Sequence, residues 1–164
     1  MRARAIASLI LVVPLLAAAC GAATSSQGVD DAFRIRALAA CADALAAKRA
    51  WASFPAGSFD PAKPDPAKLV QVGTWLDAAV QPVFDGWSAG MSGLGAPASG
   101  GPAWGALVKL VQETAQLNAA QAAAATAGDA AGFAAATAKL RASHAALQAA
   151  AKTAGVDACG DVIN

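Results

Sequence analysis

The chain alternates between stretches in which apolar residues recur every three or four positions and stretches rich in proline and glycine. Such spacing places apolar side chains on one face of a helix. The clearest case follows Asp65 and Pro66, a capping side chain with proline at the first helical position. Pro82 lies inside this helix and predicts a kink or a break near Gln81. The apolar stripe is Leu69, Val72, Leu76, Val80 (or Ala79), Val83 and Trp87.

Two of the remaining helices are marked by capping residues as well as by periodicity. The first runs from about 31 to 51, with Asp30 or Asp31 at its N-terminus. The last runs from about 130 to 154, after a glycine cap at Gly128 and before another at Gly155. The apolar residues of the first are Leu38, Cys41 and Leu45, and those of the last are Phe133, Leu140, Leu147 and Ala154.

The third helix in chain order opens at Pro102 and continues to about residue 127. Its first half has a broad apolar face, and its second half is nearly all alanine, which favours helix but buries little surface. The apolar face consists of Trp104, Leu107, Val108, Leu110, Val111 and Leu117.

Two long loops separate these helices. Residues 53–65 contain three prolines, and residues 88–101 contain five glycines and Pro97, so neither stretch favours a helix. No stretch has the alternating pattern of a strand. Four helices in this order predict an all-α domain over residues 30–164, an up-down-up-down four-helix bundle.

The N-terminus has the pattern of an export signal. Arg2 and Arg4 precede the apolar run 6–19, which is shorter than the ~20 residues of a transmembrane helix. The end of this run, Ala18-Ala19-Cys20, resembles the lipobox of bacterial lipoproteins, although Ala17 stands where that pattern favours leucine. The alternative is ordinary cleavage after Ala19, which yields a soluble secreted protein.

The lipobox resemblance implies a signal peptide over 1–19 and a lipid, such as diacylglycerol with a further palmitate-type chain, on Cys20. Residues 20–29 are small and polar and are expected to form a flexible tether. The protein would be held by its lipid on the outer face of the cell membrane, or on the outer membrane of a Gram-negative cell. The tail 154–160 resembles small lipoproteins of high-GC bacteria such as actinobacteria, a resemblance that implies no activity.

Export changes the expectation for the other two cysteines. Cys41 and Cys159 would meet an oxidising compartment, where a disulfide forms readily. The bundle order returns the end of the chain to the first helix, which allows this pairing. Alanine occupies 50 of the 164 positions, so large core side chains are few. A disulfide closing a loop of this length stabilises by ~4–5 kcal/mol in the chain-entropy model.

The sequence matches one catalytic motif, but the secondary structure that this motif requires is not predicted around it. Gly86-Trp87-Ser88-Ala89-Gly90 matches the G-x-S-x-G nucleophile elbow, and Asp129 and His144 follow in hydrolase order. The elbow requires a strand before the serine, whereas an apolar helical stripe precedes Ser88. We therefore expect no catalytic residues and keep a serine hydrolase only as a remote alternative.

His144 is the sole histidine and borders the apolar face of the last helix. It is either a hydrogen-bonded boundary residue or a ligand to haem or another metal; Met91, in the expected loop, has no positional support as a second haem ligand. The four tryptophans, at 51, 75, 87 and 104, either fill the alanine-rich core or line a pocket. The candidate ligand contacts are Trp75, Trp87, Trp104 and His144.

The charged residues of the chain say little more about its function. The mature chain has ten basic and eleven acidic residues, which excludes the basic footprint of a nucleic-acid binder. Lys48 and Arg49 read as a solvated helix end. We expect a monomeric, non-enzymatic envelope lipoprotein without cofactor or metal, which binds a protein partner or envelope component through a helical surface. The alternative is an apolar ligand or haem inside the bundle.

Overall fold

The computed structural model describes residues 28–51, 53–54 and 59–163, and this part of the chain is all-helical, as predicted. It contains no strand. The predicted signal peptide, Cys20 and nearly all of the tether lie outside the described residues. The elements are α1 (Asp31–Arg49), α2 (Pro66–Trp75), the π-helix η1 (Leu76–Val80), α3 (Gln81–Gly93), α4 (Gly101–Thr126), α5 (Ala130–Ala154) and the 3-10 helix η2 (Asp157–Ile163).

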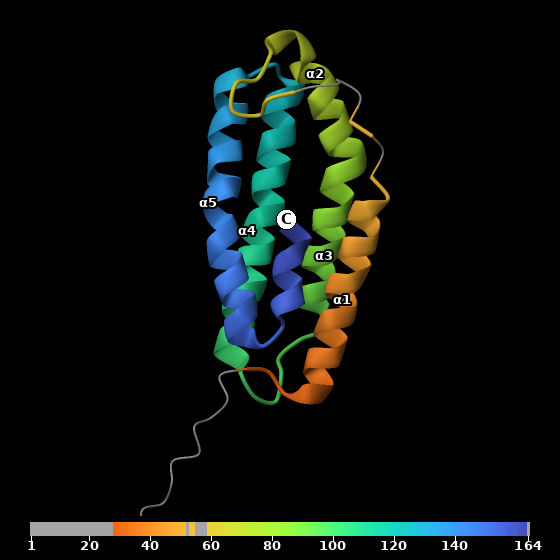
Figure 1. The fold of residues 1–164 in the computed structure, drawn as a ribbon, viewed down its shortest axis with the longest axis vertical. Helices are drawn as coiled ribbons and strands as arrows, with labels where there is room; N and C mark the ends of the chain where they lie inside the picture. Colours follow the sequence, from red (N-terminus) through yellow and green to blue (C-terminus); the bar gives the residue numbers. More distant parts are fainter. Residues whose placement is uncertain (1–27, 52, 55–58, 164) are drawn as a thin grey trace, which may run out of the picture.

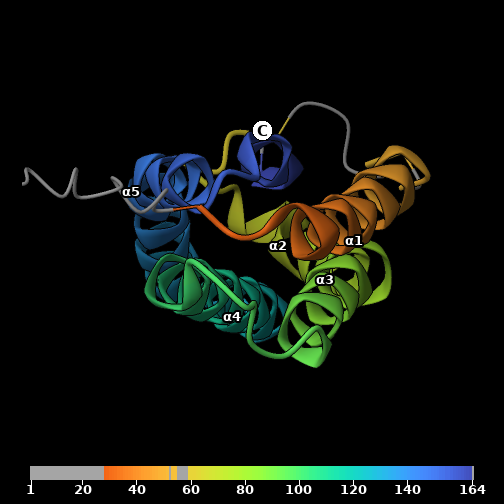
Figure 2. The ribbon, with the colours of Figure 1, turned by 90° about the horizontal axis from the view of Figure 1, so that it is seen from below.

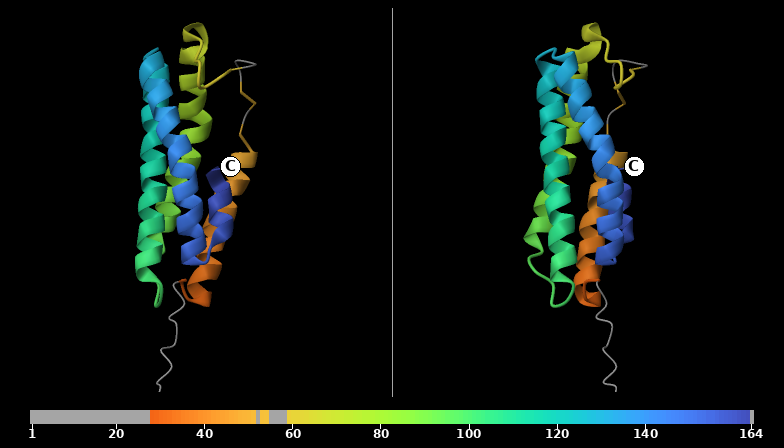
Figure 3. Two further views of the ribbon diagram at one scale, coloured as in Figure 1. Left: turned by 60° about the vertical axis from the view of Figure 1, so that its left-hand side comes forward. Right: turned by 90° about the vertical axis from the view of Figure 1, so that its left-hand side faces the viewer.

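The helices pack side by side along one long axis (Figure 1). α4 packs on α5, on α3 and on α2, while α1 packs on α3. The short helix η2 lies between α1 and α5 and contacts both (Figure 2). α1 and η2 extend along only one half of the long axis (Figure 3). In the other half, Phe54 packs on Trp75 of α2 with ring centroids 5.2 Å apart, and Phe59 packs on Phe133 of α5 with centroids 5.6 Å apart.

The predicted caps are present. The carboxylate of Asp30 accepts a hydrogen bond from the Phe33 amide at 2.9 Å, and that of Asp129 accepts one from the Gly132 amide at 2.9 Å. These bonds satisfy amides that have no partner within the helix. At the end of α5, Gly155 adopts a positive φ of 75°, and the Val156 amide donates to the Ala151 carbonyl at 2.9 Å. This geometry is a Schellman motif.

The helix that contains Pro82 neither breaks nor restarts. It passes from α2 through the π-helix η1 into α3 without a gap, and the Gln81 amide donates to the Leu76 carbonyl five residues earlier. In a regular α-helix the proline ring would clash with the carbonyl four residues back, that of Ala78, and the wider π turn accommodates it.

The residues buried after the π turn differ from the predicted stripe at one position. The predicted stripe holds from Leu69 to Val80, but the next buried residue is Phe84, and Val83 is only half-buried. Trp87 is buried as predicted, and Met91 continues the buried face at the same helical spacing. The prediction of Val83 as a core residue was wrong, because the fourth position after Val80 faces the core and the third does not.

One helix boundary and the buried face of α1 also differ from the sequence prediction. α3 continues to Gly93, so the first half of the expected loop 88–101 is helical, and Met91 is a fully buried helix residue. On α1 the core side chains are smaller than expected, since Leu38 and Leu45 are half-buried. The residues that α1 buries are Phe33, Ala37, Cys41 and Ala44.

The predicted disulfide is present and joins α1 to η2. The Cys41 and Cys159 sulfurs are 2.05 Å apart, and both residues are almost completely buried. The Trp87 indole N–H donates to Cys41 Sγ at 3.4 Å, and Met91 Sδ lies 3.6 Å from the same sulfur. A hydrogen bond also joins the residue before α1 to the end of α5, because the Val29 amide donates to the Ala154 carbonyl at 3.1 Å. The disulfide holds η2 against α1, and this hydrogen bond holds the start of α1 beside the end of α5.

Candidate functional site

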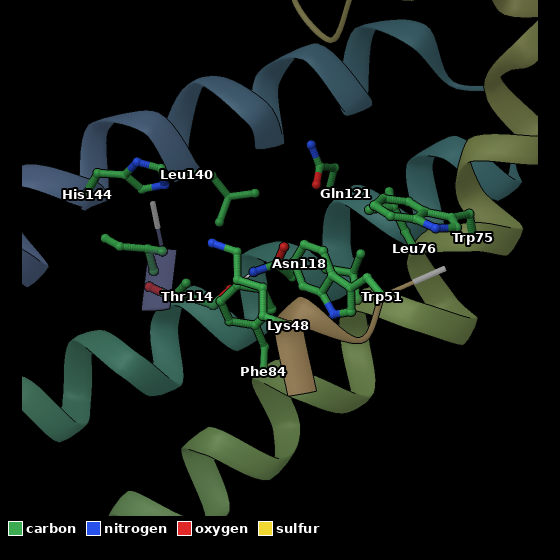
Figure 4. Close-up of a pocket in the computed structure, with 12 residues that line it drawn as sticks. Lys48, Trp51, Trp75, Leu76, Phe84, Thr114, Asn118, Gln121, Leu140 and His144 are labelled. Carbon is green, nitrogen blue, oxygen red and sulfur yellow. Dashed lines mark hydrogen bonds between the residues drawn. The ribbon is translucent and has the colours of Figure 1, made fainter. Parts of the chain in front are cut away.

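A pocket of about 310 Å³ lies where α1 and η2 both end. Lys48 comes from the last turn of α1 and Ile163 from the end of η2, and α2, η1, α3, α4 and α5 supply the other walls (Figure 4). Its volume is at the lower end of the range of small-molecule sites. The lining residues are Lys48, Trp51, Trp75, Leu76, Val80, Phe84, Thr114, Asn118, Gln121, Leu140, His144 and Ile163.

The walls of the pocket are mainly apolar and aromatic. The rings of Trp51 and Trp75 meet edge to face with their centroids 5.8 Å apart, and Trp51 lies 6.4 Å from Phe84. Phe54 extends this cluster, and the centroid of its ring lies 5.2 Å from that of Trp75. Rings held in this way give the pocket a fixed shape.

A strip of buried polar side chains on α4 forms the floor of the pocket. Thr114, Asn118 and Gln121 are each at most 8% exposed and follow one another at helical spacing. The Asn118 amide donates to the Thr114 carbonyl at 3.0 Å, and the Gln121 amide donates to Thr137 Oγ1 at 2.7 Å. These bonds fix both amide groups in orientation. Polar side chains held within an apolar pocket are what ligand sites use to orient a bound molecule.

The Trp51 indole N–H is a buried donor beside the pocket. It is inaccessible to solvent and makes no hydrogen bond within the part of the chain that the structure describes. An unpaired buried N–H costs about 1–3 kcal/mol. Because solvent does not reach this nitrogen, it does not point into the open pocket, and Trp51 contributes its apolar ring to the pocket wall.

Lys48 and His144 are the titratable groups among the described residues that line the pocket, and none of those lining residues is acidic. The Lys48 ammonium donates to the Val162 carbonyl at 3.0 Å and lies 5.7 Å from the centroid of the Trp51 ring. Burial lowers the pKa of Lys48. Burial first, and then the positive charge of Lys48, lower the pKa of His144. The pocket is therefore electropositive whenever Lys48 is protonated.

The structure separates the four predicted ligand contacts. Trp75 and His144 line the same pocket, as the small-ligand alternative expects. Trp87 lies in the core beside the disulfide, 2% exposed. Trp104 is near the opposite end of the bundle, where its ring packs edge to face on Phe33, 4.8 Å away, and its N–H donates to the Gly95 carbonyl at 3.1 Å. Trp87 and Trp104 therefore fill the core.

Sequence reasoning missed two kinds of pocket residue. Lys48 was expected to be a solvated helix end, but it is half-buried because α1 stops beside η2. Its burial depends on contacts between distant segments and leaves no local signal. The polar residues Asn118 and Gln121 do leave one, since they follow the apolar stripe of α4 at its own spacing. Polar residues on a buried face are unusual enough to mark a site.

Ser88 does not lie in a nucleophile elbow. It is a residue of α3, and no strand precedes it in the described chain. Its side chain faces a shallow groove between α3 and α4 that includes Asp85 and Gln112, whereas His144 lines the separate pocket on α5. Within the described ranges, no three histidine, cysteine, aspartate or glutamate side chains gather as a metal site would require.

Comparisons with known proteins do not assign the chain to a family. No protein-family model, curated protein or solved structure matches the chain. None of the helices in the described residues is long and apolar enough to cross a membrane.

Proposed function

We propose that the mature chain is a small extracytoplasmic lipoprotein whose helical domain binds a small, mainly apolar molecule in the pocket between α1, α4, α5 and η2. The observation that carries this proposal is the pocket itself: about 310 Å³, lined by packed aromatic rings and by the buried polar side chains of Thr114, Asn118 and Gln121. A pocket of 150 Å³ accepts benzene, so this one has room for a ligand of roughly twelve non-hydrogen atoms.

The proposed setting of this domain follows from the sequence. Export by a signal peptide over 1–19 and lipid on Cys20 would place it at the outer surface of the membrane. We further propose that the domain is an up-down-up-down four-helix bundle, in which the continuous stretch from Pro66 to Gly93 counts as one helix. The uninterrupted run of α2, η1 and α3 supports this description.

The other functions considered from sequence have less support. A haem would find one iron ligand among the lining residues, His144, because Met91 packs on the disulfide instead. Binding of a protein partner through a helical surface stays a prediction. Ile35 on α1 and Val70 on α2 are strongly exposed, but scattered apolar side chains are common on protein surfaces.

Binding of 1-aminonaphthalene, an uncharged fluorescent probe with about eleven non-hydrogen atoms, tests the proposal. We expect saturable binding at one site per chain. Leu140→Trp fills the pocket from α5 and should abolish it, while Ala142→Trp, an exposed change on the same helix, should leave it intact. Equal binding by the two variants, or no saturable binding by the wild type, would refute the pocket as a ligand site.

A further inference from the structure

Lys48 gives the pocket a positive end that forms no ion pair with any residue in 28–51, 53–54 or 59–163. Lys48 is half-buried, and its pKa is lowered by burial. The ion pairs within the described residues are Arg34 with Asp31 and Lys109 with Glu113, and neither involves Lys48. A cation withdrawn from water and left without an anion is unfavourable, and the usual remedy in a protein is a carboxylate partner.

The Lys48 ammonium also retains unused donors. It has three N–H bonds, of which the Val162 carbonyl takes one. Figure 4 shows the side chain directed toward the part of the pocket formed by Leu140 and His144. An anionic group placed there would lie next to the ammonium while the rest of the ligand lay along the aromatic walls. Charge-assisted hydrogen bonds of this kind are about twice as strong as neutral ones.

We infer that the natural ligand is an amphipathic organic acid, with its carboxylate on Lys48 and its apolar body between Trp51, Trp75 and Phe84. This inference rests on the proposed function, because it names the chemical class of molecule that the same pocket takes. The size of the pocket, its apolar walls and its charged residue together favour this class of ligand. The pocket accommodates about twelve non-hydrogen atoms, its walls are apolar, and its sole charged lining residue is Lys48.

A matched pair of ligands tests the inference. Decanoate has twelve non-hydrogen atoms, and decan-1-ol has the same chain with an uncharged head. We expect the wild type to bind decanoate at least tenfold more tightly than decanol at pH 7.5, measured by the quenching of tryptophan fluorescence. A charge-assisted bond in a partly desolvated site is sufficient for this ratio.

Variants at two lysines test whether Lys48 causes the preference for decanoate over decanol. Lys48→Met keeps an unbranched side chain of nearly the same length and removes its charge, so it should weaken the binding of decanoate about tenfold and leave that of decanol unchanged. Lys139→Met removes an exposed charge from α5 and should alter neither ligand. Since Lys48 also holds the Val162 carbonyl, the decanol arm is essential: a distorted pocket would lose both ligands together.

The outcomes separate the two proposals. Equal affinity for acid and alcohol in the wild type overturns the acid inference and leaves the pocket standing as an apolar site. An acid preference that survives Lys48→Met, or a loss of both ligands in that variant, overturns the role of Lys48. Binding of neither ligand, together with failure of the uncharged probe, refutes the ligand site altogether.

Discussion

Two helices approach each other closely at Gly73, where α2 meets the end of α4. A Cβ atom on Gly73 would lie 2.8 Å from Thr126 Cα, 2.5 Å from Thr126 Oγ1 and closer still to the backbone nitrogen. Backbone atoms cannot rotate away as a side chain does, so Gly73→Ala must push the two helices apart. The hydrogen bond from Thr126 Oγ1 to Asp77 Oδ2, 3.3 Å long, would be strained as well.

The size of the effect follows from two opposing contributions. Overpacking a tight contact costs about 3 kcal/mol at the upper end of the usual range. Replacing a helical glycine with alanine contributes about 1 kcal/mol in the opposite direction. We therefore expect Gly73→Ala to lower the free energy of unfolding by about 2 kcal/mol. With a urea m-value near 2 kcal/mol/M, the midpoint would fall by about 1 M.

Gly86 on α3 supplies the matched control. It is exposed, and a Cβ there would meet no atom within 4 Å. Gly86→Ala should therefore gain about 1 kcal/mol from helix propensity alone. Urea unfolding followed by circular dichroism at 222 nm measures both variants. Equal midpoints for Gly73→Ala and Gly86→Ala would refute the close packing of α2 on α4.

Three further predictions concern the disulfide, the histidine and the lipid. Cys41→Ala combined with Cys159→Ala should lower the free energy of unfolding by ~4–5 kcal/mol, matching the wild type unfolded under reducing conditions; an unchanged urea midpoint would contradict a stabilising role. Because the folded chain lowers the pKa of His144 below 6.5, protonation favours the unfolded chain, so stability should fall as the pH drops below 6.5. Urea midpoints at pH 7.5 and pH 5.5 should differ less in His144→Gln than in the wild type, and an equal difference would exclude His144 as the source. Cys20→Ser should release the exported protein from the membrane fraction and remove the acyl mass from its N-terminal peptide, and retention on the membrane would contradict the lipid anchor.

Features set by local chemistry were predictable from the sequence. The caps at Asp30, Asp65 and Asp129 depend on one side chain and the amides two or three residues later. The glycine at the end of α5 depends on a positive φ that other residues adopt rarely. The disulfide was predicted from an expected oxidising compartment and from a helix order that brings the two cysteines together, and the structure confirms the pairing.

Features set by contacts between distant segments were not predictable. The π turn accommodates Pro82 in a helix that is packed on both sides of it, and the buried residue that follows Val80 is Phe84, where the sequence pattern also allowed Val83. The pocket lies where α1 ends at Arg49 and η2 ends at Ile163, beside each other in the fold. No local sequence pattern predicts that these two distant helix ends lie side by side. Sequence alone gave Trp75 and His144 as candidates, but it could not separate them from Trp87 and Trp104, whose spacing on apolar helix faces is the same.

The central claim is that the pocket between α1, α4, α5 and η2 holds an organic acid, and methyl-selective NMR tests it most directly. Titration of the isotope-labelled protein with decanoate should shift the methyl signals of Leu76, Val80, Leu140 and Ile163, which line the pocket, with one saturating affinity. The exposed methyls of Ile35 and Val70 serve as internal controls and should not move. Shifts confined to Ile35 and Val70, or pocket methyls that stay in place at saturating decanoate, would contradict it.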